Sequence, residues 1–270
     1  MMVWQKYQLV FRLESPLHIG YRTVGNLMQT RGYVPGKNLW AALTARLTRD
    51  YDNGAEDRRY VEIGQQIQDH FRFTYLYPAT QNGSGFKTHY PWDNDFDYLF
   101  LDSYASTALN YISQSADDAM LHETEFIAPH TRTGQPVYFT GNLYIKTDLP
   151  TPLDNWPEAL KKLQVGAERG YGWGQLRLVS CDKQDEPFTE PPRAATHNGR
   201  ITAHLKAENA SNIYGPIEPL IGWERNNDEN RNSNWKLSQQ AYICYAPGAK
   251  VMGNHEFTIE QDGLWKYKSG

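Results

Sequence analysis

Residues 166–174, GAERGYGWG, have the composition of a loop that contacts a phosphate backbone. Their glycines, which allow positive φ angles and close approach of backbone N–H groups to an anion, are Gly166, Gly170, Gly172 and Gly174. Arg169 supplies a planar cation suited to phosphate, while Tyr171 and Trp173 offer rings on which bases can stack. The segment lacks the Lys-Ser/Thr ending of a nucleoside-triphosphate loop and follows an expected helix. The segment therefore favours contact with a ribose-phosphate strand over binding of a nucleoside triphosphate. A plain helix-to-strand turn is the alternative.

A second candidate site for an anion lies near the N-terminus, where several cations occur close together in the sequence. Residues 15–20 read SPLHIG, and residues 31–43 read RGYVPGKNLWAAL, so a glycine-rich stretch leads to the start of an expected helix. Unpaired N–H groups at such a helix start favour an anion. The side chains that we predict to contact it are His18, Arg22, Arg31, Lys37 and Asn38. The alternative is an ordinary strand-to-helix connection with solvated charges.

The periodicity of apolar residues predicts the elements that position these groups. Leu39, Leu43 and Leu47 recur every four residues, which predicts an amphipathic helix from Lys37. We expect two further helices, at residues 60–71 and 157–164. Alternating apolar residues predict strands over residues 7–13, 71–77, 97–102, 137–145 and 175–180. Polar, glycine-bearing stretches predict loops over residues 20–36 and 78–95.

The resulting order is βαββαβ, which predicts an α+β fold with a ferredoxin-like, RNA-recognition-module-like domain carrying insertions. We assign it to residues 1–182, with the glycine-rich loop before its last strand. In this fold the loops after the first strand and before the last can reach neighbouring edges of one sheet. The breaker-rich stretch DEPFTEPPR favours a junction, and residues 183–270 are expected to form a smaller β-rich C-terminal appendage. Its short apolar runs are residues 201–206, 241–247 and 255–260, separated around the polar segment 224–234.

Composition narrows the class of protein. The 270 residues include 8 Trp, 18 Tyr and 10 Phe. The net charge of −4 is uneven: residues 1–50 carry +5 and the remainder −9, which allows one basic edge on an acidic body. Two cysteines, Cys181 and Cys244, are too few for a disulfide scaffold or a four-cysteine zinc site. A mean hydropathy of −0.69 and the absence of a long apolar run argue against a membrane protein or signal peptide. We expect a cytoplasmic protein with no cofactor and no metal.

Four segments resemble the signature segments of the RAMP superfamily of CRISPR-associated proteins. They are SPLHIG, YVPGKNLWAAL, MLHETEFIAPHTRTGQPVYFTGNL and GAERGYGWGQLRL, which appear in family order across residues 15–178. The resemblance implies a ferredoxin-like fold and binding of CRISPR RNA beside other RAMP subunits and the large subunit of an antiviral effector complex. The chain is most similar to type III effector subunits, particularly the type III-D cap subunit that holds the five-prime handle of the guide. A backbone subunit along the guide is the alternative.

The resemblance also bears on catalysis. Type III backbone subunits that cut target RNA use an aspartate in the loop after the first strand, and residues 20–36 contain neither Asp nor Glu. We therefore expect no catalytic residue. A metal-independent guide-processing endoribonuclease with His18 as general base is the second alternative. A third is an unrelated aromatic-rich protein that binds sugars or a partner surface. The neighbours His122, Glu123 and Glu125 fall on opposed faces of an expected strand, which argues against a metal site.

Overall fold

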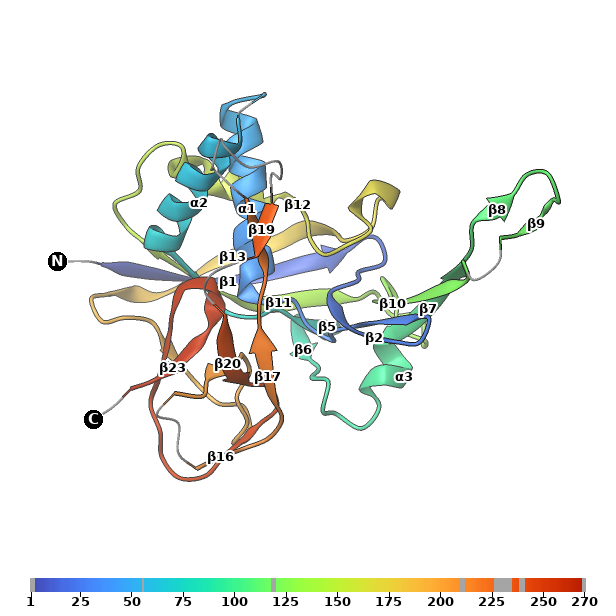
Figure 1. Ribbon diagram of the computed structural model, residues 1–270. Coiled ribbons are helices and arrows are strands. Elements are labelled where there is room, and N and C mark those ends of the chain that lie inside the picture. The colour runs from blue at the N-terminus through green and yellow to red at the C-terminus, as the bar shows by residue number, and fades with distance from the viewer. Residues whose placement is uncertain are drawn as a thin grey trace.

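The largest sheet of the computed structural model has strand β1 (Trp4–Leu13) at its centre (Figure 1). The structure describes residues 3–54, 56–117, 120–208, 212–225, 235–237 and 241–268. The strand order of this sheet is β12-β13-β1-β11-β5-β6, and β4 also pairs with β11. Its other strands are β4 (Phe71–Phe73), β5 (Tyr77–Asn82), β6 (Gly85–Thr88), β11 (Tyr138–Lys146), β12 (Lys162–Gln164) and β13 (Gln175–Phe188). All of its strand pairs are antiparallel.

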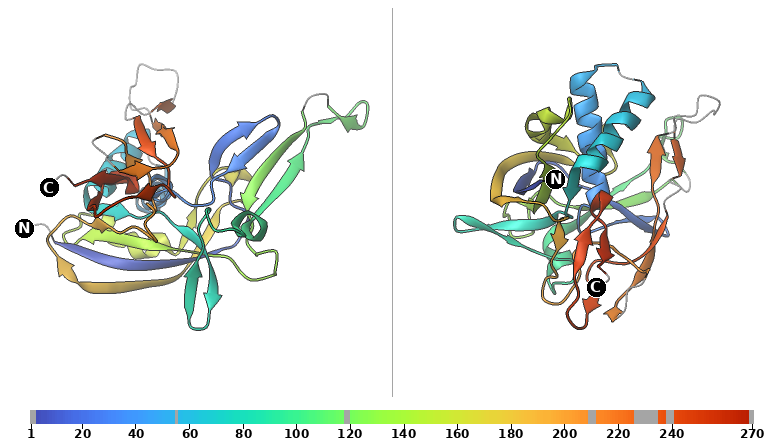
Figure 2. Two further views of the ribbon diagram at one scale, coloured as in Figure 1. Left: turned by 90° about the horizontal axis from the view of Figure 1, so that it is seen from below. Right: turned by 90° about the vertical axis from the view of Figure 1, so that its left-hand side faces the viewer.

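Helices α1 (Gly36–Tyr51) and α2 (Asp57–His70) pack together on one side of this sheet (Figures 1 and 2). Leu9, Phe11 and Leu13 alternate along β1 and are almost fully buried in the same cluster as the α1 leucines. The helices predicted from Lys37 and over residues 60–71 are confirmed, because their apolar spacing matches the observed buried faces. The mixed α and β class is confirmed too. None of the helices among the described residues is long and apolar enough to span a bilayer.

The predicted loop over residues 20–36 was wrong for its first half. Residues 20–30 form a β-hairpin of β2 (Gly20–Val24) and β3 (Leu27–Thr30). Gly25 has φ of +61° and, with Asn26, closes the two-residue connection, a pairing typical of tight hairpins. Every residue of β2 is exposed, so the strands lack the apolar alternation on which the prediction depended.

The region after α2 also differs from the predictions. Residues 78–95 were expected as a loop, but they contain most of β5 and all of β6. Residues 97–102 were expected as a strand, yet Phe96–Phe100 form helix α3 and only then does β7 (Leu101–Ser106) begin. Phe96 and Phe100 are four residues apart and both buried, which is a helical spacing. The predicted strand over residues 71–77 is interrupted, with β4 and β5 at its two ends.

The helix predicted over residues 157–164 is shorter than expected. It comprises α4 (Trp156–Leu160), preceded by the 3-10 turn η1 (Leu153–Asn155). Residues 162–164 instead form β12, which pairs with the start of β13 and buries Leu163. Backbone pairing with a long neighbouring strand therefore overrides the local helical preference. Strand β13 itself continues past residue 180 to Phe188.

A second sheet, of order β2-β3-β10-β7, extends from the main body. Strand β10 (His122–Ile127) pairs with β7 and β3, and the chain between β7 and β10 forms the short hairpin β8 (Leu109–Asn110) and β9 (Ser115–Ala116). Figures 1 and 2 show this hairpin at the end of a projecting arm. At its tip, Tyr111 and Ile112 are 89% and 98% exposed.

Residues beyond 188 add a third sheet, of order β14-β22-β23-β15-β20-β17. Its strands are β14 (Arg193–Ala194), β15 (Leu205–Lys206), β17 (Ile217–Leu220), β20 (Tyr242–Tyr245), β22 (Phe257–Ile259) and β23 (Trp265–Tyr267). Smaller pairs are β16 (Ile213–Tyr214) with β21 (Lys250–Val251) and β18 (Trp223–Arg225) with β19 (Trp235–Leu237). Most of the polar segment 224–234 lies outside the described residues. Each of the three predicted apolar runs contains a strand.

The C-terminal region packs directly on the first part of the chain. A second core cluster combines Tyr33, Tyr75 and Tyr77 with Leu205 and Trp265. The hydroxyl of Tyr77 donates a hydrogen bond of 2.7 Å to the carbonyl of Thr202. The division at residue 182 stays a prediction, and the two stretches share an aromatic core across it.

Candidate nucleic-acid interface

The glycine-rich segment forms a closed loop between β12 and β13. The N–H of Val165 donates to the carbonyl of Gly174 across its base, at 2.9 Å. Gly166 and Gly174 have φ of +83° and +76°, and a Cβ on Gly174 would lie 1.8 Å from the carbonyl oxygen of Val165. Glycine is therefore required at Gly174 by both conformation and space. A 3-10 turn, η2 (Arg169–Tyr171), forms the apex and ends at Gly172, whose φ is +83°.

The backbone of the turn at residues 15–20 forms hydrogen bonds with this loop. The N–H of Gly174 donates to the carbonyl of Pro16 at 2.7 Å, and the N–H of Ala167 donates to the carbonyl of His18 at 2.9 Å. A Cβ on Gly166 would lie 2.4 Å from that His18 oxygen. The convergence predicted for these two distant segments is therefore observed, and their glycines permit the close contact.

The apex presents its polar and aromatic side chains to solvent. Arg169 and Gly170 are exposed, and Tyr171 is 85% exposed. Trp173 is half-buried, with its ring centroid 5.1 Å from that of Phe126 on β10. The loop therefore offers one exposed cation, one exposed ring and a second ring that is held by packing.

Two glutamines hold the loop in shape, and no sequence pattern indicated either of them. The side-chain amide of Gln164 donates to the carbonyls of Arg169 and Trp173, at 2.9 and 3.0 Å. The amide of Gln175 donates to the carbonyl of Gly172 at 3.0 Å. These side-chain bonds add to the backbone bond of the turn, in which the N–H of Gly172 donates to the carbonyl of Arg169 at 3.0 Å. Side chains and backbone together therefore hold the loop conformation without a ligand.

His18 is a structural part of the turn. Its side chain is only 6% exposed, and Nδ1 donates to the backbone carbonyl of Glu125 at 2.7 Å. A general base needs direct or water-mediated access to the proton that it removes. The ring of His18 is instead enclosed between the turn and β10.

The two arginines near the turn have different surroundings. Arg22 is exposed on β2, where its Nε donates to the side chain of Gln29 at 2.6 Å. Arg31 forms a 2.7 Å ion pair with Glu218 of β17, and its side chain is 12% exposed. Burial opposes the charge of Arg31, but the neighbouring tyrosine and carboxylate raise its pKa. The guanidinium of Arg31 is therefore already paired within the chain.

Lys37 and Asn38 lie in the first turn of α1, where they line a cleft of about 310 Å³. Gly20 and Arg31 also line this cleft, and Trp223 forms part of its C-terminal wall. The turn at residues 15–20 therefore contacts the glycine-rich loop and continues through Gly20 into this cleft. The predicted residues therefore fall at the glycine-rich loop with its turn and in this cleft, except Arg22, which is exposed on β2. The cleft also includes C-terminal residues that no sequence pattern indicated.

Glu218 joins a buried network that was also missed. The hydroxyl of Tyr75 donates to Nδ1 of His204 at 2.6 Å, and Nε2 of His204 donates to Glu218 at 2.5 Å. Burial alone would raise the pKa of Glu218, but hydrogen bonds from His204 and Arg31 lower it to about 2. Burial lowers the pKa of His204, which favours the neutral ring. Arg31 and Glu218 are 187 residues apart in the sequence, so no local sequence pattern indicates that they form a pair.

The polar residues of β10 have partners within the chain. Glu125 accepts a hydrogen bond from the N–H of Thr30 at 2.9 Å, and Glu123 accepts one from Ser103 at 2.5 Å. His122 lies 2.7 Å from the hydroxyl of Ser106. Within the part of the chain that the structure describes, no group of three or more His, Cys, Asp or Glu is placed to hold a metal ion.

Comparisons with known proteins place the fold. No family model matches the chain, and neither does any curated protein. Among solved structures, a chain of the "Cryo-EM structure of the Type III-B Cmr-beta bound to cognate target RNA and AMPPnP, state 1" is similar, with a TM-score of 0.50 and 9% identity. The similarity covers 91% of this chain and 85% of that one. Two chains described as Type III-B Cmr-beta, in the apo state and bound to cognate target RNA, have TM-scores of 0.42. They are 8% and 10% identical and match 64% of this chain and 96% of theirs. The first similarity shows a shared fold.

Proposed function

We propose that this chain is a non-catalytic subunit of a type III CRISPR effector complex that binds guide RNA near its five-prime handle. The observation that carries the proposal is the backbone contact between the turn at residues 15–20 and the loop at residues 166–174. These two segments carry part of the resemblance to the RAMP superfamily, and they meet on one surface. The fold shared with a Type III-B Cmr-beta chain supports the assignment.

We further propose that the main sheet has a ferredoxin-like core. In chain order its parts are β1, α1, β4 with β5, β11, α4 and β13. In space, β13 pairs with β1, β1 with β11, and β11 with both β4 and β5, all antiparallel. This arrangement supports a βαββαβ core whose second strand is split, with α2, the arm and the C-terminal region as additions.

The loop surface suits a single-stranded RNA. Arg169 can pair with a phosphate, Tyr171 can stack on a base, and the exposed Arg22 adds a second cation beyond the turn. Because the Gln164 and Gln175 bonds already fix the loop, little conformational freedom is lost on binding. An overall charge of −4 makes binding depend on this local surface.

The surroundings of His18 support a role without catalysis. Its enclosed ring is held by the Glu125 carbonyl, and the hairpin of residues 20–30 carries no carboxylate. The endoribonuclease alternative predicts cleavage of repeat RNA by the purified chain, abolished by His18→Ala. The cap and backbone alternatives differ in copy number, so native mass spectrometry of the complex distinguishes them. A single copy supports the cap, and several copies support the backbone.

Guide-RNA affinity tests the interface. We expect the double variant Arg169→Ala, Tyr171→Ala to bind at least tenfold more weakly than the native chain, since stacking on one base contributes about 1–3 kcal/mol. The matched control is Arg58→Ala, Tyr214→Ala, which removes an exposed arginine and an exposed tyrosine elsewhere. Equal affinity of the two double variants, measured by filter binding of the assembled complex, contradicts the proposed interface.

A further inference from the structure

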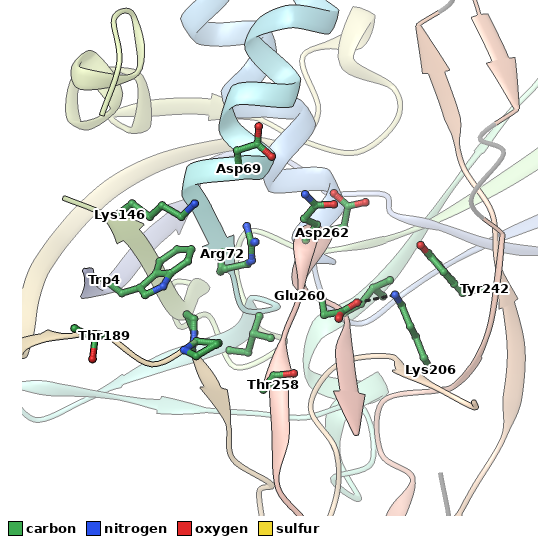
Figure 3. Close-up of a pocket in the computed structure, with 15 residues that line it drawn as sticks. Trp4, Asp69, Arg72, Lys146, Thr189, Lys206, Tyr242, Thr258, Glu260 and Asp262 are labelled. Carbon is green, nitrogen blue, oxygen red and sulfur yellow. Dashed lines mark hydrogen bonds and ion pairs between the residues drawn. The ribbon is translucent and has the colours of Figure 1, made fainter. Parts of the chain in front are cut away.

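A pocket of about 590 Å³ lies where the edges of β1, β4 and β11 meet the C-terminal region (Figure 3). Its size falls within the usual range of small-molecule sites. The first part of the chain contributes Trp4, Asp69, Arg72 and Lys146. The C-terminal region contributes Thr189, Pro191, Pro192, Lys206, Tyr242, residues 258–262 and Leu264. The pocket is separate from the loop at residues 166–174, none of whose residues line it.

Two cations of this pocket share one aromatic ring. The guanidinium carbon of Arg72 lies 5.3 Å from the Trp4 ring centroid, and the Lys146 amine lies 5.5 Å from it. Trp4 and Lys146 face each other across β1 and β11, and Figure 3 shows the lysine extending over the indole toward Arg72. The ring is only 5% exposed, so it fixes the two cations in place.

Neither cation is neutralised by a carboxylate at ion-pair distance within the described ranges. The Nη1 of Arg72 donates to the backbone carbonyls of Gln68 and Phe71, at 2.5 and 2.7 Å. Its Nε and Nη2 have no hydrogen-bond partner among the described residues, and neither does the amine of Lys146. One edge of a planar donor group and one ammonium therefore remain available to a ligand.

The carboxylates of the pocket are held by other groups. Glu260 forms a 2.6 Å ion pair with Lys206, as the dashed line in Figure 3 shows. Asp69 accepts a hydrogen bond from the Gln65 amide at 3.3 Å, and Asp262 accepts one from the Gln68 amide at 3.1 Å. Carboxylate oxygens have further acceptor sites. Besides the paired Lys206, the pocket therefore combines the Arg72 and Lys146 cations with acceptors that suit hydroxyl donors.

The environment of Arg72 favours an anion. Burial lowers the pKa of its guanidinium, while Asp69, Glu260 and Asp262 act in the opposite direction. A partly buried cation loses hydrogen bonds to water. An anion that accepts two parallel hydrogen bonds from the guanidinium compensates for that loss. A phosphate monoester carries close to two negative charges at neutral pH, which matches two cations better than a single carboxylate does.

We propose that this pocket binds a ribose phosphate, free or as a nucleoside monophosphate, with the phosphate between Arg72 and Lys146. The sugar hydroxyls donate to carboxylates of the pocket, as they do to acidic residues in dinucleotide sites. The site is independent of the proposed RNA interface, so either proposal can fail alone.

Isothermal titration calorimetry of the full chain tests this proposal. The probes are ribose-5-phosphate, AMP, inorganic phosphate and ribose. We expect both sugar phosphates to bind, inorganic phosphate to bind at least tenfold more weakly, and ribose to give no heat. AMP binding more tightly than ribose-5-phosphate identifies a nucleotide ligand, and equal affinities identify the free sugar phosphate.

The decisive variant is Lys146→Gln, because the amine contacts the Trp4 ring but makes no hydrogen bond or ion pair within the described residues. We expect it to weaken sugar-phosphate binding at least fivefold, and Arg72→Gln to weaken it further. Lys183→Gln, which removes an exposed lysine of β13 outside the pocket, is the matched control. The proposal is overturned if neither sugar phosphate binds at millimolar concentration, if inorganic phosphate binds equally well, or if Lys146→Gln and the control bind alike.

Discussion

Gly174→Ala should damage the glycine-rich loop, and Gly170→Ala, four residues earlier, should not. The added Cβ of Gly174→Ala would lie 1.8 Å from the Val165 carbonyl oxygen, at a φ of +76°. The left-handed conformation costs alanine about 1–2 kcal/mol. Moving the backbone also breaks the bonds to Val165 and Pro16, at about 1 kcal/mol each. The total is about 3–4 kcal/mol, which lowers the melting temperature by roughly 10 °C for a chain of this size.

Gly170→Ala is the matched control, because a Cβ there meets no atom within 4 Å. We expect its free energy of unfolding to stay within about 0.5 kcal/mol of the native value. Differential scanning fluorimetry measures both variants, and guide-RNA affinity is measured on the same samples. Equal melting temperatures for the two variants refute the packing argument. A large loss of stability in Gly174→Ala with unchanged RNA affinity refutes the link between the loop and RNA.

Three further predictions concern charge and packing. Because the pKa of Glu218 is lowered to about 2 from 4.5, its stabilisation is complete above pH 4.5 and lost as pH falls toward 2. Denaturant titrations should therefore show Glu218→Gln less stable than the native chain by about 1–2 kcal/mol near neutral pH, with the gap closing across that range. Arg169→Ala should reduce the slope of log affinity for guide RNA against log salt by about one, and an unchanged slope excludes a phosphate contact. Phe126→Ala should weaken RNA binding through loss of support for Trp173, whereas exposed Tyr98→Ala should not.

The elements predicted well from sequence are those whose burial follows a strong period. The leucines of α1 and the alternating residues of β1 each face one core, so local spacing was sufficient. The hairpin of β2 and β3 was missed because β2 is exposed along its whole length. For α3, the spacing of Phe96 and Phe100 was available but was outweighed by the continuous apolar run of residues 98–101, which favoured a strand.

The candidate site was predicted only in part, because only some of its contacts follow from local sequence patterns. Glycines in a loop indicate close backbone approach, and the contact of Gly166 and Gly174 with the turn followed from strand order. The pairing of Arg31 with Glu218 was not predictable, because it depends on how the C-terminal region packs. Sequence spacing carries no information on such a contact until the tertiary structure brings the two segments together.

Ultraviolet crosslinking of the assembled complex, followed by mass spectrometry, tests the central claim most directly. If guide RNA lies on the surface formed by residues 15–20 and 166–174, nucleotide adducts should map to the peptide that contains Tyr171 and Trp173. When the complex is assembled with labelled guide RNA, the labelled adducts should disappear after an excess of unlabelled guide RNA displaces the labelled strand. Adducts confined to other segments, or a purified complex in which this chain carries no crosslinked RNA, contradict the account.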